Sequence, residues 1–148
     1  DGGEQAEMTD VGAMMHQIQA ELERDGIACE LAVDAPLVVK VKANALKRCV
    51  SNLVHNAGRH AQTVRVAAGF VGHELLIVVE DDGPGIAEHD REEVFRPFVR
   101  LDDARNQDDT GSGLGLTIAL DIARSHGGEL NLSDSSLGGL KASIRIPV

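Results

Sequence analysis

The sequence predicts an α+β fold in which one mixed sheet carries helices on one of its faces. The first observation behind this prediction is that apolar residues recur at helical spacing in three segments, and alternate or run together over strand lengths in six others. The second is the order of these segments: helix, two strands, helix, two strands, long loop, helix and two strands. The third is the length of 148 residues, which fits one domain and leaves little room for a second.

The first half of the chain begins with a polar, Gly-containing stretch, residues 1–8, which we expect to be a frayed linker to a domain over 9–148. Thr9 is placed to cap a helix whose apolar stripe we interpret as core. That stripe consists of Val11, Met14, Met15, Ile18 and Leu22. The elements predicted next are the end of this helix at Asp25-Gly26, strands over 27–33 and about 37–42, and a helix from about Ala43 to His60.

The second half begins with a strand over 63–70 and continues, after a turn at Gly72-His73, into the apolar run Leu75–Val79. Such a run is typical of a central strand that is covered on both faces. Residues 80–110 are acidic and predict a long loop, of a kind that is usually functional in a compact domain. The remaining predicted elements are a short helix around 88–95, a helix opened by Gly111 to Gly115 and ended by Gly127-Gly128, and strands near 129–133 and 140–146.

Composition excludes several classes of function. The 14 Lys and Arg residues are outnumbered by 24 Asp and Glu, which gives a net charge of −10, whereas nucleic-acid binding depends on clustered basic side chains. No apolar run approaches the roughly 20 residues of a membrane-spanning helix, and the N-terminus has no basic and apolar signal peptide. Because the chain starts with Asp1 rather than Met, we expect a piece of a longer protein.

The two cysteines are too few to form a tetrahedral zinc site by themselves. Cys29 lies on an alternating apolar face and Cys49 on an apolar helix stripe, so we expect both to be buried, unreactive thiols. A structural disulfide is the alternative, although nothing in the sequence indicates an oxidising compartment.

The long helix predicted over 43–60 carries the first candidate site. Asn52, Asn56 and Arg59 share a stripe of this helix that is turned away from the apolar stripe. Asn is a mediocre helix former, so two of them on one stripe suggest a task, such as holding a metal or a polar ligand. A solvated helix face is the alternative interpretation.

Two glycine-containing segments supply further candidates. Asp81 is followed by Gly83 and Gly85, which places a carboxylate beside exposed backbone, where it can accept a hydrogen bond from the amine of a base. An ordinary turn has the same composition. Farther along, Gly111–Leu116 opens a helix, where glycines and free N–H groups favour phosphate oxygens. This segment is not a Walker A loop, because the Lys is missing, and no strand directly precedes it as in a dinucleotide fingerprint.

In this order the segments resemble the boxes of the catalytic ATP-binding domain of sensor histidine kinases, within the gyrase, Hsp90, histidine kinase and MutL (GHKL) superfamily. Residues 52–60 resemble the N box, 81–85 the G1 box, 95–100 the F box and 111–116 the G2 box. The resemblance covers about residues 9–148. Its closing stretch, Leu137-Gly138-Gly139-Leu140, is most similar to the EnvZ-like, osmosensor-type subgroup.

The resemblance implies the Bergerat fold of this superfamily: a two-layer sandwich whose mixed, mostly antiparallel sheet is covered on one face by three helices, with a mobile ATP lid over about 87–110. It implies that Asp81 accepts the adenine amine, that Asn56 binds Mg²⁺ and that Arg100 reaches the γ-phosphate. Asn52 would act beside them as a catalytic and ATP-binding residue. The further ATP-binding residues that it implies are Arg59, His60, Gly83, Gly85, Ile86, Arg96, Gly111, Gly113, Leu114, Gly115 and Leu116.

The implied activity is transfer of the ATP γ-phosphoryl group to a histidine on a separate dimerisation domain, for relay to a response regulator. Relatives that hydrolyse ATP have a Glu general base at the position of Asn52, and an Asn side chain cannot act as a base. Among the six His residues, His73-Glu74 copies the start of the phosphoacceptor motif, but it is predicted to lie in a turn. We therefore expect the phosphoacceptor to lie outside this chain.

The resemblance also implies a cytoplasmic domain of a homodimeric parent protein anchored in the inner membrane, with the fragment itself monomeric. Nucleic acid is not an expected partner. Two alternatives stay open: a stand-alone ATPase of the gyrase or Hsp90 kind, against which Asn52 counts, and a non-enzymatic ATP-sensing module that regulates a partner.

Overall fold

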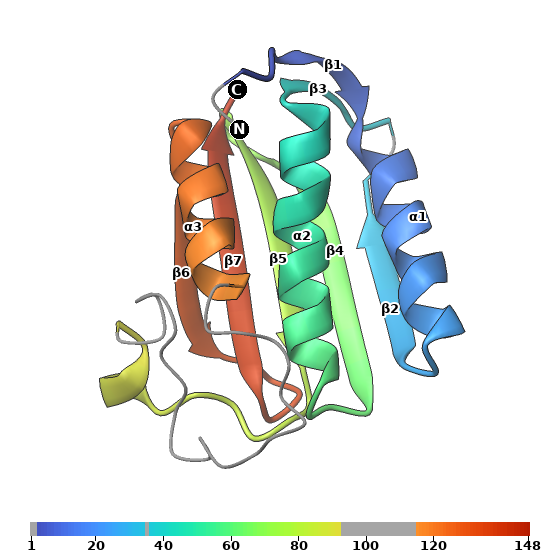
Figure 1. Ribbon diagram of the computed structural model, residues 1–148, viewed down its shortest axis with the longest axis vertical. Coiled ribbons are helices and arrows are strands. Elements are labelled where there is room, and N and C mark those ends of the chain that lie inside the picture. Colours follow the sequence, from blue (N-terminus) through green and yellow to red (C-terminus); the bar gives the residue numbers. More distant parts are fainter. Residues whose placement is uncertain (1–2, 35, 93–114) are drawn as a thin grey trace.

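The computed structural model describes residues 3–34, 36–92 and 115–148, which form two layers (Figure 1). One layer is a five-stranded sheet, and the other consists of three helices that lie together on one of its faces. The α+β sandwich predicted from the sequence is confirmed.

The five-stranded sheet has the order β2 (Ala28–Val33), β4 (Thr63–Val71), β5 (Glu74–Asp81), β7 (Leu140–Pro147) and β6 (Glu129–Asp134). β2 and β4 are parallel, whereas the other three neighbouring pairs are antiparallel. The sheet is therefore mixed and mostly antiparallel, as predicted. The apolar run over 75–79 lies in β5, the middle strand of the order.

The helices of the second layer are α1 (Val11–Arg24), α2 (Ala43–Gly58) and α3 (Gly115–Ser125). Their apolar stripes face the sheet, and the five residues predicted for the stripe of α1 are all buried. Strands add every second residue to the same core, as Leu75, Ile77 and Val79 of β5 do. Among the described residues, no helix is both long enough and apolar enough to cross a membrane.

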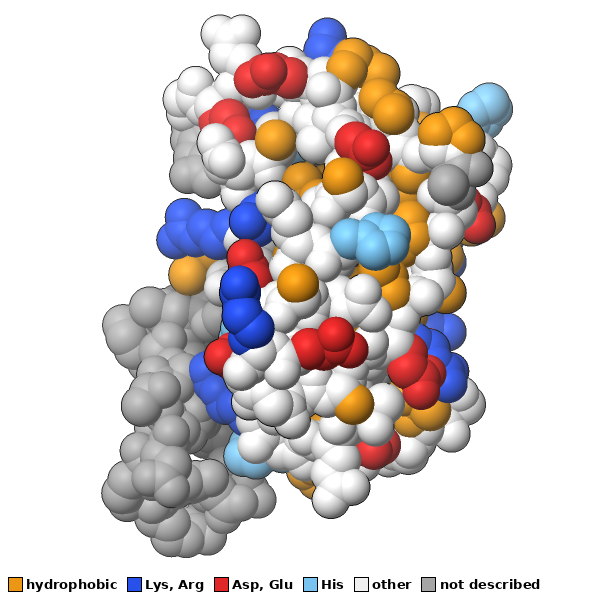
Figure 2. Space-filling view, turned by 90° about the vertical axis from the view of Figure 1, so that its right-hand side faces the viewer, with side chains coloured by type: hydrophobic (Ala, Val, Ile, Leu, Met, Phe, Trp, Pro, Cys, Tyr) orange, Lys and Arg blue, Asp and Glu red, His pale blue; other side chains and the backbone are white. Residues whose placement is uncertain are grey.

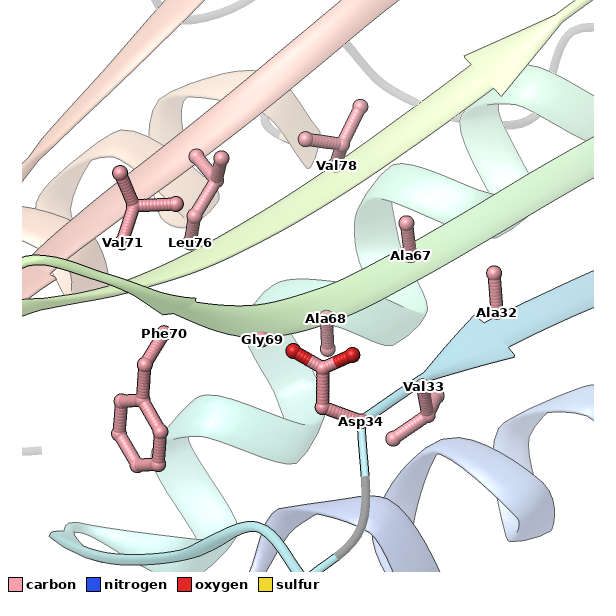
Figure 3. A pocket seen from close by; sticks show the side chains of 10 residues that line it. All are labelled: Ala32, Val33, Asp34, Ala67, Ala68, Gly69, Phe70, Val71, Leu76 and Val78. Atoms are coloured by element: carbon pink, nitrogen blue, oxygen red, sulfur yellow. The ribbon is translucent and has the colours of Figure 1, made fainter.

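The two faces of β5 are covered differently, which corrects the expectation of a strand covered on both. Leu76 and Val78 alternate with the core residues and so point away from the three helices. Together with Ala67 and Val71 of β4, they contribute to the lining of a hollow of about 470 Å³, which also includes Ala68 from the core side of β4 (Figure 3). The continuous apolar run therefore does not require helices on both faces of the strand.

Two short strands form a separate antiparallel sheet, which corrects two expectations. β1 (Glu7–Asp10) pairs with β3 (Val38–Val41), so β3 does not join the main sheet. Residues 1–8 are accordingly not a frayed linker throughout, because Glu7 and Met8 are part of β1. None of the four β1 residues is fully buried. The strand is therefore held by backbone pairing with β3. Because it buries no side chain, its sequence shows no alternation of apolar residues.

Helix starts also differ from expectation in one place. The N-cap of α1 is Asp10, whose Oδ1 accepts a hydrogen bond from the backbone N–H of Ala13 at 3.0 Å. Thr9 instead donates its hydroxyl to the carbonyl of Glu7. The short helix expected around 88–95 is a 3₁₀ turn, η1 (Glu88–Asp90), in its described part, and residues 93–95 lie outside the described residues.

The N-terminus of α2 is held by two side chains from distant parts of the chain. Both carboxylate oxygens of Glu4 accept hydrogen bonds, from the N–H groups of Asn44 and Ala45, each at 2.9 Å. The Nε2 atom of His126, just beyond α3, accepts from the N–H of Lys42 at 3.0 Å. These bonds satisfy N–H groups that a helix start leaves without partners inside the helix, so Glu4 too is part of the folded domain.

Both cysteines are buried, free thiols, as predicted. Burial raises the pKa of Cys29 to about 11 and that of Cys49 to about 12. Neither side chain is therefore a thiolate near neutral pH, and both contribute to packing rather than to chemistry.

Candidate active site

The last two turns of α2 carry the predicted amide side chains. Asn52 and Asn56 are both half-buried, whereas Leu53 and Ala57 on the neighbouring stripe are buried in the core. α2 ends at Gly58 rather than His60, and Arg59 forms its C-cap. Both Arg59 and His60 are exposed in the connection to β4.

Asp81 is the last residue of β5 and one of the few buried polar side chains of the described part. Its Oδ1 atom accepts hydrogen bonds from two backbone N–H groups, that of Gly83 at 2.9 Å and that of Leu140 at 3.2 Å. Its backbone carbonyl accepts a third, from Gly139 at 3.1 Å. Because a carboxylate has further lone pairs on its second oxygen, this arrangement fixes the side chain and leaves acceptor capacity for a ligand.

Asp82 faces the connection between α2 and β4. Its Oδ1 atom accepts from the backbone N–H groups of Gln62 at 2.9 Å and Thr63 at 3.1 Å, while its own N–H donates to the carbonyl of Thr63 at 3.3 Å. The hydrogen bonds from Thr63 and then Gln62 hold the pKa of Asp82 below its ordinary value, although the side chain is exposed to solvent.

The glycines after Asp81 lie where backbones approach one another. A Cβ atom at Gly83 would lie 3.1 Å from the carbonyl oxygen of His60. Gly85 adopts a positive φ of 75° and contacts the backbone of Gly139. Ile86, which follows, is partly buried against the core. The turn over 81–86 is therefore packed between the α2–β4 connection and the β6–β7 hairpin.

The β6–β7 hairpin contributes contacts that the sequence analysis did not assign. The hydroxyl of Ser135 donates to Oε1 of Glu80 at 2.8 Å and accepts from the N–H of Leu137 at 2.9 Å. The N–H of Ser135 donates to the carbonyl of Gly139 at 2.8 Å, which closes the hairpin over Asp81. The signal in the sequence was the pair Gly138-Gly139 before the last strand.

Arg91 was also missed, and it joins η1 to the rest of the molecule. Its Nε donates to the carbonyl of Ile86 at 3.0 Å, and its guanidinium forms an ion pair with Asp134 at the end of β6. The Arg91 side chain is largely buried, whereas Asp134 is exposed, so the ion pair lies at the surface and we expect it to contribute little to stability. Nothing in the local sequence pattern distinguished Arg91 from the other arginines of the acidic segment.

Several predicted residues lie outside the described part of the chain. These are Arg96, Arg100, Gly111, Gly113 and Leu114, together with most of the expected lid over 87–110. Gly115 and Leu116 are described as the first residues of α3, which packs beside α2 (Figure 1). A Cβ atom at Gly115 would meet no atom of the described residues within 4 Å.

The side chains of this region differ in their capacity to bind a metal ion. Among the described residues, no group of three or more His, Cys, Asp or Glu side chains could hold an ion. Asn56 offers a neutral amide oxygen, which suits a Mg²⁺ ion that keeps waters and the phosphates of a substrate as its other ligands. The residues present therefore fit a magnesium ion brought in with a nucleotide better than a resident one.

Two other parts of the described surface differ from this region. The hollow in Figure 3 has a single charged side chain, Asp34, among its lining residues, and it has no basic group for a phosphate. On the face shown in Figure 2, described acidic and basic side chains are interspersed. The candidate site is therefore the region that joins the end of α2, the turn after β5 and the β6–β7 hairpin.

Comparison with known proteins gives a consistent family. Residues 41–148 match the family model HATPase_c, "Histidine kinase-, DNA gyrase B-, and HSP90-like ATPase". The chain is 42% identical over 107 residues to the sensor histidine kinase CpxA of Escherichia coli, covering 71% of this chain and 23% of CpxA. It is 37% identical over 144 residues to the sensor histidine kinase GtrS of Pseudomonas aeruginosa, covering 97% and 29%. The chain thus spans about a quarter of the length of these curated relatives.

Solved structures share the fold. The histidine kinase domain of the E. coli osmosensor EnvZ is 37% identical, with a TM-score of 0.74, and the match covers 97% of this chain and 89% of that one. The ATP-binding domain of PrrB from Mycobacterium tuberculosis has a TM-score of 0.81 at 24% identity, covering 97% of each chain, which supports the fold alone.

Proposed function

Because this chain belongs to the family of histidine kinase-, DNA gyrase B- and HSP90-like ATPases and is homologous to sensor histidine kinases, we propose that it transfers the γ-phosphoryl group of ATP to a histidine on a separate dimerisation domain. The observation that carries this proposal is the fixed carboxylate of Asp81 at the end of β5, whose Oδ1 atom accepts hydrogen bonds from two backbone N–H groups. A buried acceptor in that position suits the exocyclic amine of adenine.

The base would be held by the turn over 81–86. Asp81 accepts the adenine amine, and Gly83 and Gly85 let the backbone approach the ring. Ile86, already packed against the core, supplies an apolar wall. This assignment uses residues that the structure brings together at one end of β5.

The phosphates would lie along α2 and the start of α3. Asn56 binds Mg²⁺, with Asn52 one turn before it on the same stripe. When bound, Mg²⁺ neutralises charge on the phosphate oxygens. From the α2–β4 connection, Arg59 approaches the phosphates, and His60 lies beside the adenine or ribose. At the start of α3, Gly115 and Leu116 offer backbone N–H groups.

The remaining contacts are predictions from the sequence. Arg100 is expected at the γ-phosphate, with Arg96 near it, and Gly111, Gly113 and Leu114 are expected to donate N–H groups to the phosphates. Transfer depends on such positioning and charge neutralisation more than on covalent chemistry by the protein.

The acceptor and the partners belong to the longer protein. Asn52 cannot act as a general base for water, which favours transfer over hydrolysis and counts against a stand-alone ATPase. The expected partners are the phosphoacceptor domain of a homodimeric parent and a response regulator, with the parent anchored in the inner membrane and this domain in the cytoplasm. His73 does not fit the acceptor role, because it lies in the tight β4–β5 turn after Gly72, whose φ is 60°.

The test is phosphotransfer in two parts. The isolated chain is incubated with γ-labelled ATP and Mg²⁺, alone and with the dimerisation domain of its own parent. We expect acid-labile label on that domain, formed slowly because the two parts are no longer linked, and none on the isolated chain. Asn56→Ala should abolish transfer, whereas His73→Gln should leave it intact. Rapid phosphate release without the partner would favour the ATPase alternative, and nucleotide binding without transfer would favour the ATP-sensing module.

A further inference from the structure

Asp82 connects two loops that meet at the proposed nucleotide site. On one side is the turn over 81–86, and on the other is the connection from Arg59 to Gln62, which leads from α2 into β4. One oxygen of Asp82 accepts the successive N–H groups of Gln62 and Thr63, at 2.9 and 3.1 Å. The side chain therefore fixes the end of the connection at the point where β4 begins.

Additional contacts show that the two loops are packed together and not merely adjacent. The N–H of Asp82 donates to the carbonyl of Thr63, which continues the β4–β5 ladder by one bond. Farther back in the connection, the carbonyl of His60 lies 3.1 Å from where a Cβ atom of Gly83 would be. The connection thus lies close to Gly83 at His60 and is hydrogen-bonded to Asp82 at its end.

Global stability does not account for this arrangement. Asp82 is exposed, and water can satisfy the N–H groups of Gln62 and Thr63 if the side chain is removed. β4 and β5 are already paired from Val64–Asp81 to Val71–Glu74, so the sheet does not depend on this side chain. What the carboxylate determines is the path of the connection between α2 and β4.

We propose that Asp82 is a positioning residue, which fixes the Arg59–Gln62 connection against the Asp81–Gly83 turn and so sets where Arg59 meets the phosphates of ATP. The assignment of Arg59 to the phosphates rests on the proposed function. The adenine end does not depend on Asp82 in the same way, because Asp81 is held by Gly83 and Leu140. Removal of Asp82 should therefore affect the two ends of the nucleotide unequally.

The experiment compares the wild type with Asp82→Ala, Asp82→Asn and a control, Asp121→Ala, which removes an exposed carboxylate from α3. Calorimetry measures binding of Mg·ATP and of adenosine to each. Asp82→Ala should weaken Mg·ATP about five-fold, the size expected for one net hydrogen bond, and should change adenosine binding by less than about two-fold. Asp82→Asn keeps an oxygen acceptor of the same reach and should restore most of the ATP affinity.

Amide hydrogen exchange supplies a readout that does not depend on nucleotide. Exchange at Gln62 and Thr63 should be faster in Asp82→Ala than in the wild type, and close to the wild type in Asp82→Asn and Asp121→Ala. Melting temperatures of the four proteins should differ by no more than a few degrees, which shows that the fold is kept.

Three outcomes would overturn the proposal: equal losses for ATP and adenosine, an ATP affinity that does not change although exchange accelerates, or an Asn variant as weak as the Ala variant. If the wild type binds neither ligand, the proposed function fails instead. In that case the exchange data still report whether Asp82 fixes the connection, so the two failures are distinguishable.

Discussion

Gly139 is packed so closely on Asp81 that a methyl group at residue 139 would overlap with Asp81 Oδ1. The same added atom would lie 2.6 Å from the carbonyl oxygen of Asp81 and 2.8 Å from the backbone nitrogen of Gly83. Two of these three neighbours are backbone atoms, which cannot swing aside as a flexible side chain does. The β6–β7 hairpin and the turn after β5 therefore form one packed unit.

Gly139→Ala should lower stability and weaken ATP binding. Overpacking of this kind costs about 1–3 kcal/mol, and here it displaces the side chain proposed to bind adenine. Urea denaturation and calorimetry measure the two effects. Gly3→Ala near the chain start is the control, because its added Cβ would meet no described atom within 4 Å. Wild-type affinity in Gly139→Ala would contradict the contact.

Asp81→Asn should reduce ATP affinity about ten-fold or more, since hydrogen bonds to charged groups contribute about 1.5–3 kcal/mol. The variant keeps the size of the side chain, but it loses the charge and presents a donor in place of one acceptor. Binding is measured by calorimetry, with Asp121→Asn on the exposed face of α3 as the control for loss of charge. If Asp81→Asn and Asp121→Asn bind ATP with equal affinity, Asp81 is not part of the adenine site.

Asn56→Ala should weaken Mg·ATP far more than adenosine. The amide oxygen is proposed to bind the metal, and adenosine brings neither metal nor phosphate. Titration of both ligands into the variant provides the comparison, and the phosphotransfer assay should show no activity. A parallel loss for both ligands would point to a packing defect in α2, where the neighbouring Ala57 is buried.

Glu4→Gln should destabilise the domain by about 1 kcal/mol, because it removes a charge from the N-terminus of α2 and one of two oxygens that accept N–H groups there. Chemical denaturation measures the change. Glu7→Gln, also near the chain start but exposed in β1, serves as the charge control and should have little effect. If the two variants are equally stable, Glu4 does not cap α2 in solution.

Asp82 should add to the acid sensitivity of the fold. Its folded pKa lies below the ordinary value of 3.8, so the stability it contributes is present above that value and is lost as the pH falls through the folded pKa. Asp82→Asn removes this contribution, and its unfolding midpoint should depend less steeply on pH below about pH 4. Urea midpoints measured across this range give the slopes. Identical slopes for variant and wild type would contradict the lowered pKa.

Much of the fold could be predicted because periodicity determines it. The stripe of Val11 to Leu22 and the alternation of residues 63–70 gave α1 and β4 close to their observed bounds. β1 could not be predicted, since its four residues have no buried side and its pairing with β3 depends on backbone bonds across the chain. The expected cap, Thr9, lies one residue before the observed cap, Asp10, and both residue types are suited to that position.

The candidate site, too, could be predicted only where its residues lie close together in the sequence. Asp81 and its glycines could be recognised because they follow an apolar strand within a few residues. The hairpin contacts of Ser135 and Gly139 were not, because they join residues up to 59 positions apart, as Leu140 and Asp81 are. No local pattern records which turn a hairpin covers, and the same holds for the contact of Arg91 with Asp134.

The hydrogen bonds on Asp81 have a consequence for the entropy of binding. Because Gly83 and Leu140 hold Oδ1, the rotamer of this side chain is set when the domain folds. A ligand that reaches the second oxygen meets a group that has no rotational freedom left to lose, and an unrestrained side chain would add about 0.5–1.5 kcal/mol of ordering cost at that step. The backbone of the hairpin thus acts as a preorganising element, and specificity at this position is established before the ligand arrives.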